Sequence, residues 1–234
     1  MTQLKTLNRR QFMAITGRSG GALILGCSLG GLGLSGNASA KPIQPKSDGT
    51  GQPLGAFVTI KENGDIDIIC HRAEMGQGIL TSVPQIIAEE LGADWSKVNA
   101  VLGNADPKYG DQNTGGSASI RRHFLHIRQM GASARELLKQ AAANKWGVEK
   151  SKVKALNHQV VYGSKQLGYG ELAADAAKLP LPEISSLKLK DSADYTLIGK
   201  EDIALQGLEK IVTGEATYAQ DVQLPGMLLS LIHI

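Results

Sequence analysis

The stretch Arg72-Ala73-Glu74-Met75-Gly76-Gln77-Gly78-Ile79-Leu80-Thr81-Ser82 decides the fold of this chain. Before it, residues 65–70 (DIDIIC) read as a short strand with β-branched side chains on its inward positions. After it, apolar side chains recur at helical spacing and predict a helix to about Leu91, stopped by Gly92: Ile79, Leu80, Val83, Ile86, Ile87 and Leu91. Pro84 has no N–H to donate, so it is expected in the first helical turn. The segment Gly76-Gln77-Gly78 therefore lies on the turn between strand and helix.

This turn has two interpretations. Two glycines allow a ligand to approach the backbone closely, and the free N–H groups and dipole of a helix start favour an anion. Gln77 between them can both donate and accept hydrogen bonds. The alternative is a tight strand-to-helix turn that binds nothing.

A second glycine-rich loop follows at residues 104–119 and ends in Thr114-Gly115-Gly116-Ser117-Ala118-Ser119. A helix is predicted from about Ile120, with Ser117 or Ser119 as its cap. Arg121 and Arg122 would then lie in its first turn, where the dipole disfavours cations unless an anion is near. The alternative is an ordinary cap with solvated arginines. His123 and His126 could share a metal ion, but no third ligand is evident, which favours two surface or core histidines.

The order of the elements predicts an α+β fold, a mixed sheet with packed helices. Two strands alternate around Asn63-Gly64, a strong hairpin signal, and residues 98–102 give a third strand after the key helix. Residues 159–162 open a small hairpin, and a short helix follows from Tyr169 to Lys178. An extended crossover covers 179–195, and residues 196–200 and 211–218 are expected to form the opening strand of a new unit.

Residues 1–40 have the features of an export signal. Asn8-Arg9-Arg10-Gln11-Phe12-Met13 is a twin-arginine pattern, residues 19–40 carry no charge, and Ala38-Ser39-Ala40 is a small-residue cleavage site. We therefore expect a periplasmic protein that begins at Lys41. The alternatives are a membrane-anchored form and a lipid on Cys27. The string at 31–36 matches G-x-G-x-x-G, but no strand precedes it, so it is not read as a dinucleotide site.

Composition excludes several classes of protein. Four positive charges lie in residues 1–40, which hold no acid, so the formal charge of +3 for the whole chain becomes −1 without them. That balance gives no support to nucleic-acid binding. Only Cys70 remains after residue 40, which excludes an internal disulfide, a cysteine zinc site and an iron–sulfur cluster in that part.

Motifs in matching order resemble the large, molybdopterin-binding subunit of the xanthine dehydrogenase/aldehyde oxidase family, closest to the isoquinoline 1-oxidoreductase β-subunit type. They begin at RAEMGQGILTS and end at IVTGEATYAQDVQLPGML: residues 72–82, 87–98, 114–121, 131–135, 145–148, 169–172, 197–200 and 211–228. The resemblance implies that the two glycine-rich turns contact a molybdenum–molybdopterin cofactor, in a simple or dinucleotide form. The implied cofactor-binding residues are Gly76, Gln77, Gly78, Gly115, Gly116, Ser117 and Ser119.

The same resemblance implies an oxidoreductase that inserts oxygen from water into an N-heterocycle or aldehyde. Its electrons leave through a separate small [2Fe-2S] subunit and, in some members, a cytochrome c. The substrate is a small molecule, and the competing interpretation is an exported α+β binding module without redox chemistry.

The resemblance also divides the chain into segments. We expect a signal peptide at 1–40, a linker at 41–55, the first part of the molybdopterin-binding domain at 56–190, and a linker with the start of the hammerhead domain at 191–229. Residues 230–234 depart from the family pattern and read as an atypical, non-native tail, and the loop at 104–113 is shorter than usual. The family's catalytic glutamate lies beyond the matched part, so no catalytic or metal-binding residue is assigned, and the chain alone is expected to be inactive.

Overall fold

The computed structural model describes residues 52–201, 203–230 and 232. The chain divides into two units, residues 1–41 and 42–234, and all described residues belong to the second. The twin-arginine pattern, the cleavage site, Cys27, most of the expected linker and most of the expected tail lie outside the described residues.

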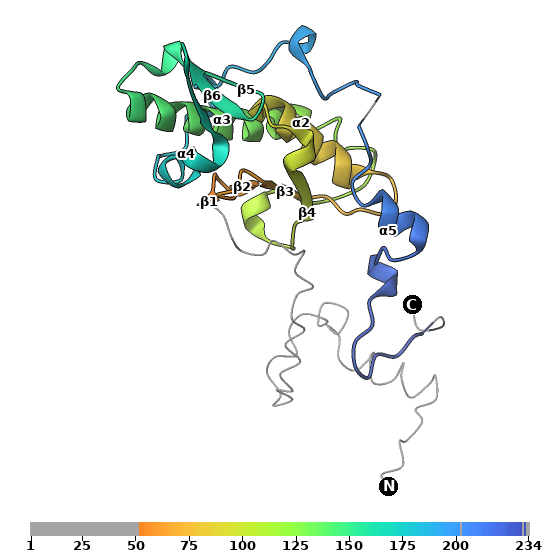
Figure 1. The fold of residues 1–234 in the computed structure, drawn as a ribbon. Coiled ribbons are helices and arrows are strands. Elements are labelled where there is room, and N and C mark those ends of the chain that lie inside the picture. Colours follow the sequence, from red (N-terminus) through yellow and green to blue (C-terminus); the bar gives the residue numbers. More distant parts are fainter. Residues whose placement is uncertain (1–51, 202, 231, 233–234) are drawn as a thin grey trace, which may run out of the picture. The chain divides into compact units, whose positions relative to one another are not determined.

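A four-stranded mixed sheet carries the predicted strands (Figure 1). Its order is β1 (Gln52–Pro53), β2 (Val58–Ile60), β3 (Ile66–Cys70) and β4 (Val98–Leu102). The first three strands are antiparallel, whereas β3 and β4 are parallel, with Ile66 opposite Val98 and Cys70 opposite Leu102. A parallel pair needs a crossover, and α2 supplies it. The predicted α+β mixed sheet is confirmed.

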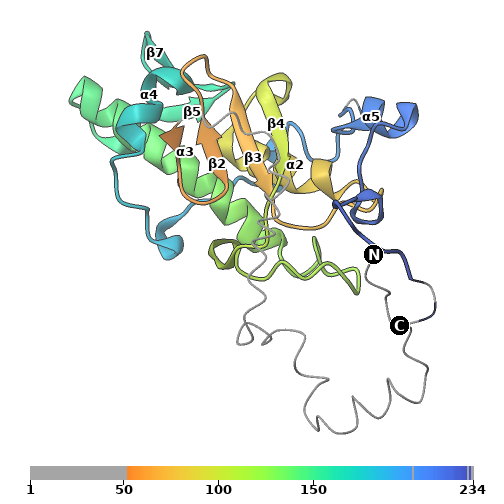
Figure 2. The same ribbon diagram turned by 90° about the horizontal axis from the view of Figure 1, so that it is seen from below.

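Two helices cover one face of this sheet, as Figure 2 also shows: α2 (Ile79–Leu91) and α3 (Phe124–Trp146). The predicted stripe of α2 is buried except for the half-buried Leu80, with Val83, Ile87 and Leu91 fully buried, and Gly92 ends the helix in a left-handed conformation. The two helices cross at Gly131, where an added β-carbon would lie 2.3 Å from the carbonyl oxygen of Ile87. Glycine at this position therefore allows the two backbones to approach closely.

A three-stranded antiparallel sheet packs on α3, in the order β5 (Lys154–Leu156), β6 (Gln159–Tyr162) and β7 (Lys165–Gly168), and leads into α4 (Tyr169–Ala176). The hairpin and short helix expected there are confirmed. The buried Tyr169 hydroxyl donates to the carbonyl of Leu91 at 2.6 Å. His158 accepts from the N–H of Asp94 at 3.3 Å and lies 2.8 Å from the carbonyl of Gly64. These contacts tie the small sheet to the end of α2 and to the first hairpin.

Two buried carboxylates at the end of α2 hold the extended segment 188–198, called here the strap. Glu89 accepts from the Lys190 ammonium at 2.7 Å and from the N–H groups of Thr196 and Leu197 at 2.8 and 2.6 Å. Glu90 accepts from Arg128 at 2.7 Å and Arg135 at 3.1 Å, both on α3. Burial acts to raise the pKa of Glu89, but these hydrogen bonds outweigh it and lower that pKa. Glu89 is therefore ionised, and both carboxylates are paired with cations within the core.

Four expectations for local structure are wrong. Pro84 lies inside α2 beyond its first turn. Helix α3 begins at Phe124 rather than near Ile120, and its cap position is His123, so neither Ser117 nor Ser119 caps it. Residues 196–200 form no strand, because the N–H groups of Thr196, Leu197 and Ile198 donate to Glu89 instead of to a sheet.

The fourth error concerns residues 211–218. A short helix, α5 (Leu208–Thr213), occupies the Ile-Val-Thr run, and left-handed glycines at both ends, Gly207 and Gly214, delimit it. The remaining short turns are 3₁₀ helices at Trp95–Lys97, Pro107–Tyr109, Lys150–Lys152, Ile184–Ser186, Ser192–Asp194 and Ala219–Asp221. Within the described residues, no helix is both long and apolar enough to cross a membrane.

Candidate functional site

The first glycine turn is closed by its own carboxylate, that of Glu74. One oxygen accepts from the N–H groups of Gly76 at 2.7 Å and Gly78 at 3.1 Å, and the other accepts from Leu80 at 2.8 Å. The protein itself therefore supplies the anion expected at the start of α2, because the Glu74 carboxylate accepts from N–H groups that have no partner within the helix.

Gln77 is folded back onto the same turn. Its side-chain oxygen accepts from the N–H of Met75 at 2.6 Å, and its nitrogen donates to the carbonyl of Ala73 at 2.7 Å. Gly76 and Gly78 have φ angles of 93° and 82°, which side-chain-bearing residues rarely adopt. The glycines and Gln77 together fix the shape of the turn.

The second glycine loop is fastened directly to the first. The hydroxyl oxygen of Thr114 accepts from the N–H of Ala73 at 2.9 Å. Arg72, two residues after the end of β3, donates to the carbonyl of Asn113 and lies 3.9 Å from the carboxylate of Asp111. Arg72 is 1% exposed, and its second terminal nitrogen has no hydrogen-bond partner among the described residues. This buried guanidinium is the clamp that brings two loops 41 residues apart against each other.

The two loops line a cavity of about 370 Å³. Of the seven predicted cofactor residues, the structure brings four together around it: Gln77, Gly115, Ser117 and Ser119. Gly76, Gly78 and Gly116 belong to the same loops but do not line the cavity. Further lining residues are Met75, Ile79, Ser82, Thr114 and Ile120.

The second loop offers unused donors to this cavity. The hydroxyls of Ser117 and Ser119 and the N–H groups of Gly115, Gly116 and Ser117 have no partner in the part of the chain that the structure describes. Gly116 and Ser117 both have left-handed φ angles, 58° and 51°, a geometry in which consecutive N–H groups turn toward one side. This donor set, with exposed Arg121 and Arg122 just beyond it, fits the phosphate of a bound cofactor.

The histidines near this loop form no metal centre. His123 lies 3.4 Å from the carboxylate of Asp111, and burial lowers its pKa. His71 is buried, accepts from Arg72 at 3.2 Å, and is neutral because burial, followed by the charge of Arg72, lowers its pKa to about 4. Across residues 52–201, 203–230 and 232, no three metal-ligating side chains lie close enough to hold an ion.

Sequence reasoning missed two residues that build this site, Arg72 and Asp111, and it assigned no role in the site to a third, Glu74. An acidic residue just before a predicted helix start was the available signal for Glu74. No signal in the sequence pairs Arg72 with Asp111, since they are 39 positions apart and α2 and β4 lie between them.

Comparison with known proteins agrees with this geometry. Residues 24–220 match the family described as "Molybdopterin cofactor-binding domain". The chain belongs to this family. It is 32% identical to the membrane-bound aldehyde dehydrogenase [pyrroloquinoline-quinone] of Gluconacetobacter polyoxogenes over 95% of its length. It is also 30% identical to the β-subunit of isoquinoline 1-oxidoreductase from Brevundimonas diminuta and to the B-subunit of nicotinate dehydrogenase from Pseudomonas putida, over 76% and 75% of its length.

This molybdopterin-binding chain spans only part of those relatives. It covers 29%, 28% and 15% of their lengths, in the same order. The family assignment therefore concerns the cofactor-binding domain, which is the portion that the matched residues represent.

Proposed function

We propose that this chain forms one wall of the molybdopterin site in the large subunit of an exported molybdenum hydroxylase. The observation that carries the proposal is that two glycine loops, 41 residues apart at their clamp, line a single cavity with unused donors on the second loop. Membership of a molybdopterin-binding family supports the proposal, because this cofactor has an anionic phosphate and a polar ring system that would suit the donors of the cavity.

The two loops have different roles in this proposal. Ser117, Ser119 and the adjacent N–H groups would hold the phosphate end, since charge-assisted hydrogen bonds from hydroxyls and amides suit an oxyanion. Glu74 and Gln77 would not bind the cofactor's charge, because their polar atoms already hold the first turn in shape. When bound, the molybdenum cofactor supplies oxidation of a C–H bond by two electrons, with water as the source of oxygen and two protons released.

The finer assignments complete the proposal. The substrate is an N-heterocycle or aldehyde, in keeping with the names of the three relatives. The two electrons pass to a small [2Fe-2S] subunit and then, in some assemblies, to a cytochrome c. Export through the twin-arginine route to the periplasm rests on Arg9 and Arg10 and the cleavage site that follows. Arg9→Lys with Arg10→Lys should retain the precursor in the cytoplasm, and a double variant that still reaches the periplasm would contradict the route.

Cofactor content tests the site itself. The chain is produced in a bacterium that makes the cofactor, and molybdenum and pterin are measured after purification. Ser117→Ala with Ser119→Ala should lower both, because each hydrogen bond to a charged group contributes about 1.5–3 kcal/mol. Ser164→Ala, in the exposed turn between β6 and β7, is the matched control and should retain wild-type content. Equal content in all three proteins would remove the second loop from the site.

Two alternatives are separated by the same samples. The name of the Gluconacetobacter relative includes pyrroloquinoline quinone, so that cofactor is assayed alongside molybdenum and pterin. Quinone found without molybdenum would mean that the quinone replaces the proposed cofactor. If the samples contain neither cofactor, the result favours an exported binding module without redox chemistry.

A further inference from the structure

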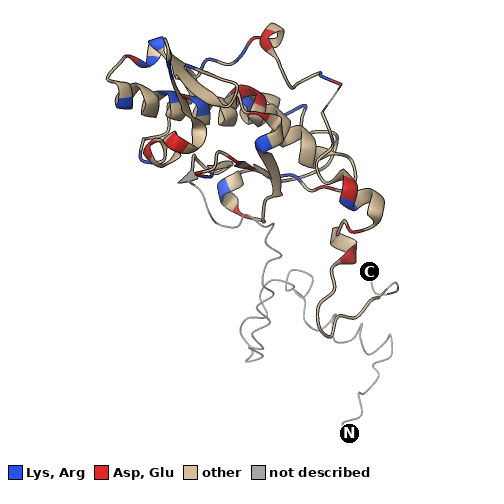
Figure 3. Ribbon diagram, viewed as in Figure 1, with Lys and Arg blue, Asp and Glu red and all other residues tan. Residues whose placement is uncertain are grey.

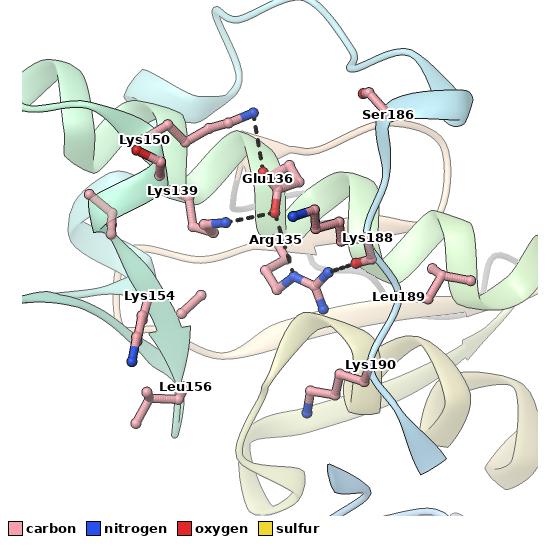
Figure 4. A pocket seen from close by; sticks show the side chains of 13 residues that line it. Arg135, Glu136, Lys139, Lys150, Lys154, Leu156, Ser186, Lys188, Leu189 and Lys190 are labelled. Atoms are coloured by element: carbon pink, nitrogen blue, oxygen red, sulfur yellow. Dashed lines mark hydrogen bonds and ion pairs between the residues drawn. The ribbon is translucent and has the colours of Figure 1, made fainter. Parts of the chain in front are cut away.

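A second cavity lies away from the glycine loops, between α3, β5 and the strap, and has a volume of about 640 Å³ (Figure 4). Its lining is strongly basic, with one carboxylate, Glu136, against six cationic side chains: Arg135, Lys139, Lys150, Lys154, Lys188 and Lys190. These basic residues belong to α3, the 3₁₀ turn after it, β5 and the strap, and Figure 3 colours the Lys and Arg positions of the chain blue.

The carboxylates at hand do not balance this charge. Glu136 is shared by Lys139 at 2.9 Å and Lys150 at 3.2 Å, as Figure 4 shows. Behind the lining, Glu90 pairs with Arg135 and Glu89 with Lys190. Three carboxylates thus face six cations, and the exposed side chains of Lys154 and Lys188 have no ion pair among the described residues.

The walls are held in place by the core. Arg135 donates to the backbone carbonyl of Lys188, and the N–H of Lys190 donates to Glu90 at 3.1 Å, so the strap is fixed opposite β5. Leu156 and Leu189 add apolar surface between the charges. A preformed concave site of mixed apolar and cationic character is typical of small-molecule pockets, whose volumes run from about 300 to 1,000 Å³.

We infer that this cavity binds an organic anion with at least two negative charges, of the phosphate or carboxylate kind. The inference goes beyond the proposed function, because the cavity shares no lining residue with the one between the glycine loops. Arg135 lies eleven residues into α3 from Phe124, roughly 16 Å along the helix axis. A hollow with walls from three segments favours a small ligand over the flat acidic face of another protein, and the field of the basic lining attracts the anion.

Protection of lysines from chemical labelling tests the site without any substitution. The full chain is treated with an amine-reactive reagent with and without ATP in magnesium-free buffer, and modified positions are read by mass spectrometry. ATP should protect Lys154 and Lys188 but not Lys165, which is exposed on β7 outside the cavity. Adenosine, which lacks the charge, should protect none of them.

Titration of variants measures the same site by affinity. Lys154→Gln with Lys188→Gln removes no ion pair and should weaken ATP binding about fivefold or more, whereas Lys165→Gln should leave it unchanged. No saturable ATP binding, equal protection of Lys165, or equal affinity in the double variant would overturn the inference. Protection by a polyglutamate peptide but not by ATP would overturn it in favour of a protein-docking surface.

Discussion

The crossing of α2 and α3 at Gly131 predicts a large effect from one methyl group. In Gly131→Ala, the new β-carbon would lie 2.3 Å from the carbonyl oxygen of Ile87 and 3.0 Å from the β-carbon of Glu90, where real contacts are essentially never below 3.0 Å. The nearer obstacle is backbone, which cannot rotate away as a side chain can. The two helices must therefore separate at their closest point.

The free energy of unfolding should fall by about 2 kcal/mol. Overpacking of a close-packed interior costs about 1–3 kcal/mol. The upper part of that range applies because the helix backbone must move, while the better helix propensity of alanine returns about 1 kcal/mol. For a chain of this size the midpoint of thermal unfolding should then drop by roughly 4–8 °C.

Urea unfolding followed by circular dichroism measures this difference. Ser133→Ala, two positions further along α3 and half-buried, is the control and should unfold as the wild type does. Because α2 begins at the first glycine turn and α3 follows the second loop, Gly131→Ala should also lower pterin content. A variant as stable as the wild type would refute the close crossing.

Three further predictions concern the cluster around the first turn. Glu74→Ala leaves three N–H groups without an acceptor and should lower the free energy of unfolding by about 0.5–2 kcal/mol in urea unfolding; no change would show that the carboxylate does not cap α2. The folded pKa of His71, about 4 against 6.5 ordinarily, means that the unfolded chain binds more protons between those values. Stability contributed by His71 should therefore be present above pH 6.5 and lost as pH falls toward 4, and an imidazole titration by NMR near 6.5 would contradict this. Burial raises the pKa of Cys70 to about 11, so a thiol reagent at neutral pH should label it only after unfolding, with peptide mapping to separate it from Cys27; rapid native labelling would disprove the burial.

Local pattern was enough to predict the elements whose own side chains decide them. The stripe from Ile79 to Leu91 and the strand at 98–102 have the observed bounds. Burial of one face specifies the helix, and the buried Val98 and Val101 hold the strand. The strand predicted at 211–218 is wrong. β-Branched residues favour a strand only where a neighbouring strand pairs with them, and α5 forms there instead.

The site was predictable in outline for a similar reason. Glycine turns at Gly76 to Gly78 and Gly115 to Gly116 can be seen in the sequence, but their meeting depends on Arg72 and Thr114, whose contacts span 41 positions. The start of α3 at Phe124 was missed because the preceding residues are held as turns beside that clamp rather than by a serine cap. Long-range polar contacts of this kind leave no periodic trace in a sequence.

The buried carboxylates of α2 have a consequence for the order of folding. Glu90 accepts from the backbone of Lys190, and Glu89 from that of Thr196, partners separated by 100 and 107 positions. Before the strap has been synthesised, the packing of α2 against α3 leaves the carboxylates of Glu89 and Glu90 without some of their partners. An unpaired buried charge is costly, so these carboxylates would have to stay in contact with water. High sequence separation also slows closure. We therefore expect α2 and α3 to stay loosely packed during synthesis and to pack tightly only after residue 198 has emerged. Docking of the strap would then be the late step that completes this part of the core.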